Sequence, residues 1–536
     1  MPLRKSTIIF LLFFILIFTS LTGCIFEDLI SGSDFKLDNW IITDSEGFPA
    51  VYLNYKFSEK ITLEIIDPYS NMIDYDFFYH SKFKNGNTSL NIGDYRKTAE
   101  PGTYKIKIYN KDNKLVQTKS FTLTGPIISI KSCDQSWWKN ADTYFLVGLN
   151  MLIQNTGDTP VYPYSVEMVV DSEIIKGFTL PNVILPGENR YVQCFIYKKD
   201  VPTESLFSVT LKDWDGNILT SGIFPYIVKS NIQTITYDKG LENELKIPNL
   251  EYLFSYYNNL DRITVEDYGV FIFDKYDDVY LDLILDLIKN TMDFGEFEFN
   301  LQDDVDKINY IAGFVQGLSY KADSLLNDSF EYPRYPIETI HNDGGDCEDK
   351  AILTASLLNN LGYDVALFRL PNHMAVGVNL TEQQNLGYQY YIDNYFFLET
   401  TNEGNKCGSI PRDYRNPTEL TVYKIQTRAF ITHNWKDGVI TIYSNTEKGD
   451  YVKVISYLEN LGNQTAENIY VEGLFITDKG LVLNSKTLQV GSLEPYDKLK
   501  LSLSVIIPTG IKTKFETRVY SNGVLVDTEI SKDYFE

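Results

Sequence analysis

Hydrophobic and polar residues alternate along much of this chain, which is the pattern typical of half-buried β-strands. In PGTYKIKIYNKDNK, Tyr104, Ile106 and Ile108 alternate with lysines and a polar turn follows, so a β-hairpin is expected. The chain also has 39 tyrosines and 32 phenylalanines, which pack well on a pleated sheet. The pattern predicts a β-sandwich over residues 35–124.

A second β-rich region, 126–229, shares a pattern with the C-terminal region, 437–531. Each contains an apolar strand, an Asn-x-Gly turn that begins at Asn155 or Asn460, and another strand. The segments VILPGENRYVQCFI and GSLEPYDKLKLSLSV then follow at similar spacing. The shared order predicts two copies of one immunoglobulin-like β-sandwich. The module resembles the adhesion-type β-modules of archaeal and bacterial surfaces, which act mostly as spacers or weak binding surfaces.

The hydrophobic period changes between these two regions, over residues 236–425. Apolar residues recur at every third or fourth position in 276–292 and in 303–320, which predicts two amphipathic helices. A third apolar stripe runs from residue 347 to a helix-ending Gly362. We expect this region to mix helices and strands and to hold any catalytic site.

The N-terminus reads as an export signal. Basic residues precede IIFLLFFILIF, and the apolar run ends in LTGC at Cys24. LTGC resembles the lipobox of exported lipoproteins, which implies cleavage of the 1–24 signal and lipidation of Cys24. The alternative is an uncleaved anchor, because Ser6–Phe26 carries no charge and about 20 apolar residues span a bilayer. Both readings tether the chain to the outer face of the cytoplasmic membrane, at the cell surface.

Charge and cysteine usage fit an exported protein. The net charge of −24 argues against nucleic-acid binding, because phosphates must be neutralised by Lys and Arg. Cys133 and Cys194 fall in the same β-rich region, and an oxidising location permits a disulfide between them. The sequence alone does not fix the connectivity.

The segment GGDCEDKAILTASLL places Cys347 at a predicted helix start. Asp346 suits the N-cap position and Asp349, three residues on, suits a capping box. Unpaired backbone N–H groups and the helix dipole favour a thiolate there. The flanking acids oppose it, unless Asp346 and Glu348 point away from the sulfur. A buried structural cysteine is the alternative.

A histidine follows in PNHMAVGVNL. The alternating residues from Met374 to Leu380 form a core face, whereas His373 shares the opposite face with Ala375 and Gly377. These two small residues leave room for another group beside the imidazole. An imidazole is the base that turns a thiol into a thiolate–imidazolium pair.

A third candidate lies in YQYYIDNYFFLETT. Asp393 and Asn394 form a tight-turn signal, so Asp393 is interpreted as a turn residue. Glu399 lies on the return strand among aromatic residues, where a carboxylate should be paired. An imidazole N–H is the expected partner, and a solvated edge glutamate is the alternative.

This order of helix with Cys, strand with His and next strand with acid resembles the transglutaminase-like superfamily. The matching phrases are YPIETIHNDGGDCEDKAIL, HMAVGV and FLETT, within residues 304–415. The resemblance implies that Cys347 is the nucleophile, His373 the base and Glu399 the orienting acid, although most of the superfamily has Asp there. It implies a papain-like α+β domain over 236–425, and the repeated strand pattern predicts all-β immunoglobulin-like sandwiches on either side of it.

The expected function is that of a membrane-tethered extracellular enzyme of acyl transfer. The Cys347 thiolate would attack an amide of a protein or peptide at the cell surface, with hydrolysis or transamidation as the outcome. The alternative is a non-catalytic cell-surface binding or scaffold module. Gln316 is a candidate oxyanion donor or an ordinary polar helix residue. There is no HExxH, paired CxxC or EF-hand pattern, so no metal or cofactor is expected.

Overall fold

A computed structural model describes most of the chain after the N-terminal segment. The described residues are 36–57, 61–78, 84–140, 143–170, 172–199, 206–226, 234–238, 244–248, 250–260, 267–274, 276–292, 304–323, 332–380, 391–415, 419–436, 440–442 and 449–536. The predicted export signal and Cys24 lie outside these ranges. Among the described helices, none combines the length and the apolar character that a membrane span requires.

The first unit consists of two antiparallel sheets, with orders β1-β2-β5 and β4-β3-β6-β7. Alternate residues of both sheets, such as Leu53 and Ile106, point into one shared core. The predicted hairpin at Tyr104 is confirmed as β6 and β7. The strands are β1 Lys36–Ser45, β2 Phe48–Phe57, β3 Ile61–Ile66, β4 Met72–Phe78, β5 Lys84–Asn91, β6 Gly102–Tyr109 and β7 Leu115–Leu123.

The second unit is a single seven-stranded sheet of order β14-β13-β10-β11-β12-β9-β8, and it curls until its edges approach. The amide of Gln135 on β8 donates to the carbonyl of Pro225 on β14 at 3.4 Å, and Trp137 packs against Tyr226. The sheet is therefore nearly closed and barrel-like. The strands are β8 Ile128–Asn140, β9 Thr143–Asn155, β10 Ser165–Val170, β11 Glu173–Thr179, β12 Asn189–Lys199, β13 Leu206–Lys212 and β14 Ile218–Pro225.

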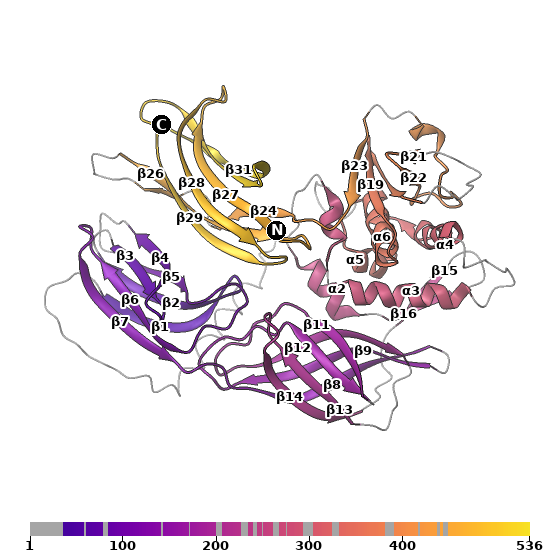
Figure 1. Ribbon diagram of the computed structural model, residues 1–536, viewed down its shortest axis with the longest axis horizontal. Helices are drawn as coiled ribbons and strands as arrows, with labels where there is room; N and C mark the ends of the chain where they lie inside the picture. The colour runs from indigo at the N-terminus through magenta and orange to yellow at the C-terminus, as the bar shows by residue number, and fades with distance from the viewer. Residues whose placement is uncertain are drawn as a thin grey trace, which may run out of the picture.

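The five described α-helices follow, beside a small sheet of order β21-β22-β20-β19-β23 (Figure 1). The three predicted helices are confirmed as α3, α4 and α6. The helices are α2 Glu251–Asn258, α3 Asp278–Met292, α4 Asp304–Gln316, α5 Pro336–His341 and α6 Cys347–Asn360, with 3₁₀ turns η2 Tyr268–Phe271 and η4 Arg412–Tyr414. The strands are β15 Thr234–Asp238, β16 Glu244–Pro248, β17 Ser319–Tyr320, β18 Gly344–Gly345, β19 Val365–Leu370, β20 His373–Val378, β21 Tyr391–Ile392, β22 Tyr395–Leu398 and β23 Thr421–Ile425.

The last unit again has two antiparallel sheets. In one, β26 pairs with β24, β25 and β29, and the other has the order β28-β27-β30-β31. Phe475 and Leu503 lie in the core between them. The strands are β24 Ile431–Trp435, β25 Ile440–Ile442, β26 Tyr451–Asn460, β27 Ala466–Ile476, β28 Val482–Leu493, β29 Lys498–Ile506, β30 Thr513–Ser521 and β31 Val524–Phe535.

The predicted fold class, an α+β papain-like domain flanked by immunoglobulin-like sandwiches, is wrong. The described residues are mostly β, with 53% in strands and 15% in helices, and one of the predicted sandwiches is the barrel-like sheet. The helices also do not enclose a core of their own. Phe195 of β12 contacts Tyr280 of α3 with ring centroids 6.1 Å apart, and one hydrophobic core extends from the barrel through α3 to α6. Periodicity located the helices but not the surface on which they pack.

The repeated Asn-x-Gly motif has a structural cause that is independent of the sheets around it. Asn155 donates to the carbonyls of Thr159 and Ile184 at 2.7 and 3.1 Å, and its Oδ1 accepts from Gly157 N at 3.0 Å. Asn460 makes equivalent contacts with the carbonyls of Gln464 and Leu493 and with Gly462 N. Each asparagine is fully buried and satisfies backbone groups that the turn leaves unpaired. The repeat therefore marks one turn geometry in two different sheet arrangements.

The first and last units are joined to each other although they lie at opposite ends of the chain (Figure 1). Lys453 pairs with Asp76, and Lys500 Nζ lies 2.7 Å from Asp74 Oδ2. The barrel also contacts the first unit, because Tyr162 donates to Asp44 at 2.7 Å. These contacts hold distant parts of the sequence in one assembly.

Candidate functional site

Cys347 is the first residue of α6, as predicted, and the preceding backbone fixes its position. Gly344 and Gly345 form β18, which pairs in parallel with β17. Gly344 has φ of 138°, and a Cβ there would lie 2.0 Å from the carbonyl oxygen of Ser319. Glycine is therefore required for the close approach of the two strands, and this approach sets the start of α6.

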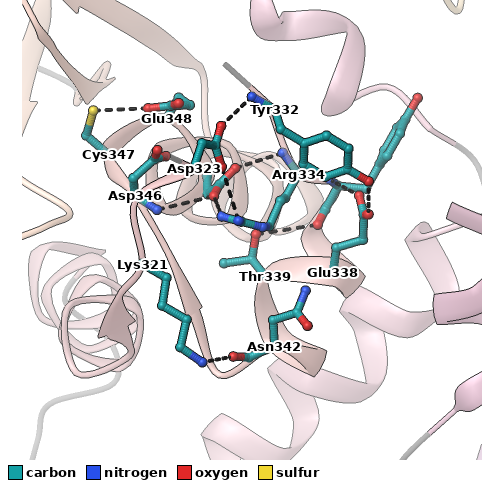
Figure 2. A network of polar contacts seen from close by, with 12 residues as sticks. Lys321, Asp323, Tyr332, Arg334, Glu338, Thr339, Asn342, Asp346, Cys347 and Glu348 are labelled. Carbon is teal, nitrogen blue, oxygen red and sulfur yellow. Dashed lines mark hydrogen bonds and ion pairs between the residues drawn. The ribbon is translucent and has the colours of Figure 1, made fainter. Parts of the chain in front are cut away.

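The thiol of Cys347 points toward Glu348. Its Sγ donates to Glu348 Oε2 at 3.1 Å, so the expectation that Glu348 points away from the sulfur is wrong (Figure 2). Burial raises the pKa of the Cys347 thiol and the Glu348 carboxylate raises it further, whereas the backbone N–H of Met374 acts against them. The resting geometry thus holds a protonated thiol, and the predicted thiolate–imidazolium pair is not preformed.

The start of α6 is fastened by a buried ion pair that the sequence did not indicate. Asp346 is the N-cap residue, and its backbone N–H donates to Asp349 Oδ2 at 3.2 Å, as the capping pattern predicted. The Asp349 carboxylate also accepts two hydrogen bonds from Arg334. One comes from the backbone N–H of Arg334 at 2.7 Å and the other from the Arg334 guanidinium. Arg334 is 4% exposed and Asp349 is fully buried. The segment before α5 is therefore tied to the helix that carries Cys347.

Burial and mutual repulsion hold protons on this acidic cluster. Burial, followed by the nearby Glu348, raises the pKa of Asp346 to about 8. Burial and the neighbouring Asp346 raise the pKa of Asp349 to about 8, although Arg334 opposes the shift. Burial is also the main cause of a raised pKa at Glu348. The acidic groups around Cys347 therefore outnumber the cationic groups beside them, of which Arg334 is the one that lowers their pKa values.

His373 and Glu399 are brought together as predicted. His373 Nε2 lies 3.0 Å from Glu399 Oε2, and the other oxygen of Glu399 accepts from Thr401 N at 2.8 Å. Burial acts to raise the pKa of Glu399, but the hydrogen bond and charge of His373 and the bond from Thr401 hold it below its ordinary value. Glu399 is fully buried, so it is not the solvated edge residue of the alternative interpretation.

A tyrosine holds the imidazole in its plane. The ring of Tyr414, in η4, stacks on His373 with centroids 4.3 Å apart and planes 5° from parallel. Stacking fixes the ring orientation while Glu399 fixes its rotation in the plane. Tyr414 stands more than 40 residues from His373, and its sequence context gives no signal of this role.

The loop that follows Glu399 is fastened to α4. Gln316 Nε2 donates to the carbonyls of Glu399 and Asn405 at 2.7 and 2.9 Å, and its Oε1 accepts from Gly404 N at 3.0 Å. Asn309 Oδ1 accepts from Cys407 N at 2.7 Å. Both amide hydrogens of Gln316 are thereby used, so this buried polar helix residue positions the Glu399 loop and is not a free oxyanion donor.

Cys347 and His373 lie on adjacent elements, α6 and β20, whose side chains pack together. The backbone N–H beside the sulfur belongs to Met374, the residue after His373. Within the described residues, no hydrogen bond joins the Cys347 thiol to the imidazole itself, since the thiol donates to Glu348. The structure thus assembles the His–acid pair on β20 and at the end of β22, and places the cysteine at the start of the neighbouring helix, α6.

The space predicted beside His373 is filled. Both faces of β20 are buried, and a Cβ on Gly377 would lie 2.5 Å from the Phe368 ring and 2.8 Å from Tyr395 Cβ. Ala375 and Phe397 belong to the same second core. The small residues therefore accommodate aromatic side chains of the sheet, not a substrate.

Asp393 has the predicted turn role. It and Asn394 adopt positive φ values of 49° and 70°, as a tight hairpin turn between β21 and β22 requires. Its carboxylate pairs with Lys424 at 2.7 Å, and both side chains are about half exposed.

The possible disulfide between Cys133 and Cys194 is not formed, and both thiols are free and buried. Cys133 lies on β8 and Cys194 on β12, with β9 between them, since they face Met151 and Leu149 of that strand. Strands on either side of a third are about 10 Å apart, whereas a disulfide requires Cα atoms within about 7 Å.

Comparisons with known proteins leave the family open. No family model and no curated protein matches this chain. The solved structures that match include the exo-chitosanase CsxA of Amycolatopsis orientalis, at 8% identity and a TM-score of 0.15, over 90% of this chain and 76% of that one. Another is the YadV chaperone, at 7% identity and a TM-score of 0.12, over 36% of this chain and 98% of that one. Scores this low support no inference about fold or function.

Proposed function

We propose that the protein is a cysteine acyl-transfer enzyme that acts on an amide of a protein or peptide. The observation that carries the proposal is the buried His373–Glu399 pair, located on β20 next to the start of α6. The likeness of the motifs to the transglutaminase-like superfamily gives the same roles to Cys347, His373 and Glu399.

In the proposed reaction, Glu399 holds the proton of His373 Nε2, which leaves Nδ1 as the basic atom. As the Cys347 sulfur attacks the amide carbonyl carbon, Nδ1 takes the thiol proton. The carbon–nitrogen bond then breaks, and the leaving amine receives that proton. The resulting thioester is resolved by water, giving an acid, or by an amine, giving a new amide, and the thiol is restored.

The electrostatics favour proton transfer during the attack over a preformed thiolate. Burial and Glu348 keep Cys347 protonated at rest. A neutral imidazole oriented by Glu399 can accept the proton when the carbonyl carbon is already in contact with sulfur. His373 therefore acts as a general base in this proposal.

Acylation by p-nitrophenyl acetate tests the proposal without knowledge of the natural substrate. We expect peptide mass spectrometry to find acetyl on Cys347, and His373→Ala to slow its appearance by about 10²-fold or more. Cys133, Cys194 and Cys407, all buried, serve as internal controls. His433→Ala is the matched control variant, because the buried His433 also forms a hydrogen bond to a carboxylate, that of the partly buried Asp527 at 2.7 Å. Equal acetylation in the His373 and His433 variants would contradict the assignment.

A non-catalytic binding or scaffold module is the second candidate, and the Cys347–Glu348 hydrogen bond favours it. In that case Cys347 is a structural residue at a helix start. Acetylation no faster than that of a free cysteine peptide, and unchanged by His373→Ala, would support this candidate.

We also propose that the protein is exported and tethered at its N-terminus to the outer face of the cytoplasmic membrane. The apolar run ending in LTGC supports this location. Metabolic labelling with a palmitate analogue, compared between the natural chain and Cys24→Ala, distinguishes lipidation from an uncleaved anchor.

A further inference from the structure

Lys350 is a buried cation that the proposed reaction does not use. It lies three residues after Cys347 on α6 and is 1% exposed. Its Nζ donates to the carbonyl of Leu318 at 2.6 Å and to that of Gln316 at 3.3 Å. Both of these partners are neutral carbonyl groups. An ammonium group is costly to bury away from water and from a counter-ion, so its place here needs a structural reason.

The two carbonyls lie at the C-terminal end of α4. A helix leaves its last four carbonyls without intrahelical donors, and the negative end of the helix dipole lies there. α4 ends at Gln316, and Leu318 follows in the turn after it. The Lys350 ammonium therefore supplies hydrogen bonds and positive charge where both stabilise α4. These contacts fasten the start of α6 to the end of α4.

The end of α4 is connected to both halves of the candidate site. On one side, the Gln316 side chain donates to the carbonyl of Glu399 at 2.7 Å and accepts from Gly404 N at 3.0 Å. On the other side, Leu318 is followed directly by β17, which pairs with β18 just before the helix that carries Cys347. A displacement of the end of α4 would therefore move Glu399 and the backbone before Cys347.

We propose that Lys350 is a positioning residue, which holds the end of α4 so that Glu399 stays within hydrogen-bond distance of His373. It acts through Gln316 and not by contact with the reacting atoms. Its charge acts in the same direction. Burial lowers the pKa of Lys350, whereas the nearby Glu403 and Glu399 oppose this shift, so the buried ammonium and the Glu399 carboxylate attract each other.

The contact between His373 and Glu399 can be measured without any reaction. An imidazole N–H that donates to a buried carboxylate forms a short, strong hydrogen bond, and its proton resonates at low field. We expect one such resonance from His373 Nε2–H in the NMR spectrum of the full chain in mild detergent. His433, bonded to Asp527 at 2.7 Å, should give a second one, which reports whether a variant is folded. The variants His373→Ala and His433→Ala assign the two resonances.

Lys350→Met keeps a long, unbranched side chain and removes its three donors. We expect the His373 resonance to be lost, because the end of α4 is released, while the His433 resonance remains. Lys350→Arg keeps the charge and the donors and should retain both resonances. Lys453→Met is the matched control and should also retain both, since Lys453 is another buried lysine, 3% exposed, on β26 of the last unit.

The same variants are then compared in the acetylation of Cys347 by p-nitrophenyl acetate, a readout that rests on the proposed function. Lys350→Met should slow acetylation about tenfold or more, because small displacements of catalytic groups reduce rates steeply. Lys350→Arg should slow it less than about threefold. If the natural chain acetylates no faster than a free cysteine peptide, while the His373 resonance still depends on Lys350, the proposed reaction fails and the positioning role stands.

Two results overturn the proposal. One is a natural chain without a low-field resonance from His373, and the other is an unchanged His373 resonance in Lys350→Met. If Lys350→Met also loses the His433 resonance, it has unfolded, and Gln316→Leu carries the test, because it removes the contact between the end of α4 and Glu399. An unchanged His373 resonance in Gln316→Leu overturns the proposal, and its loss with the His433 resonance retained supports it.

Discussion

His373 Nε2 lies 3.0 Å from Glu399 Oε2 in a fully buried contact, whereas the acid of the nearby turn, Asp393, is half exposed and pairs with Lys424. We therefore expect Glu399→Gln to slow acylation of Cys347 by about 10²-fold, because the imidazole loses the charge that stabilises its protonated form. Asp393→Asn should change the rate less than twofold. Rapid-quench acylation with mass detection measures both variants. The reverse order would show that Asp393 is the acid.

The same pair makes stability depend on pH. The pKa of Glu399 is lower in the folded protein than its ordinary value of 4.5. The ionised Glu399 therefore contributes its full stabilisation of the fold above pH 4.5, and this contribution is lost as the pH falls through the pKa of the folded protein. Glu399→Gln should therefore lower the free energy of unfolding by about 1–3 kcal/mol at pH 6.5, with a difference that shrinks below about pH 4. Urea denaturation at both pH values measures it. A difference that grows on acidification would contradict the lowered pKa.

Glu348 should lower the reactivity of the Cys347 thiol toward alkylating agents. The carboxylate 3.1 Å from Cys347 Sγ disfavours a second negative charge, so Glu348→Gln should speed alkylation by iodoacetamide about tenfold at pH 7, measured in EDTA. Peptide-resolved mass spectrometry follows Cys347 and the buried Cys407 in the same sample. A rate increase at both cysteines would indicate loosening of the fold, and no increase at Cys347 would show that Glu348 does not control it.

The Arg334–Asp349 pair should carry much of the local stability. Arg334→Met leaves a fully buried carboxylate without its counter-charge, and we expect a loss of about 3–5 kcal/mol in the free energy of unfolding at pH 8. Adding Asp349→Asn should restore part of it. Lys424→Met, which removes an exposed pair, is the control and should cost less than about 1 kcal/mol. Equal losses in the two single variants would show that burial does not matter here.

Local features of the site were accessible from the sequence because they depend on neighbours along the chain. The cap at Asp346, the helix that begins at Cys347 and the turn at Asp393 each follow from a few adjacent residues. The pairing of His373 with Glu399 followed from a chemical requirement, since a buried carboxylate needs a donor.

Features that depend on distant residues were missed or misread. Tyr414, Arg334 and Asp323 reach the site from other segments, and no local pattern marks them. Glu348 was expected to point away from sulfur because its rotamer cannot be derived from helix position alone. The barrel was read as a sandwich because strands of both folds alternate in the same way, and sheet closure depends on long-range contacts such as Gln135–Pro225.

The ion pairs Lys453–Asp76 and Lys500–Asp74 join residues 377 and 426 positions apart in the chain. The backbone and these ion pairs together form a closed loop. If the backbone is cut once in a connecting segment, the two fragments remain joined through the first and last units. We expect a singly nicked chain to elute as one species in native size-exclusion chromatography and to separate into two fragments only in denaturant. A pull applied to the first unit would accordingly load the C-terminal strands directly, bypassing the helices that carry Cys347.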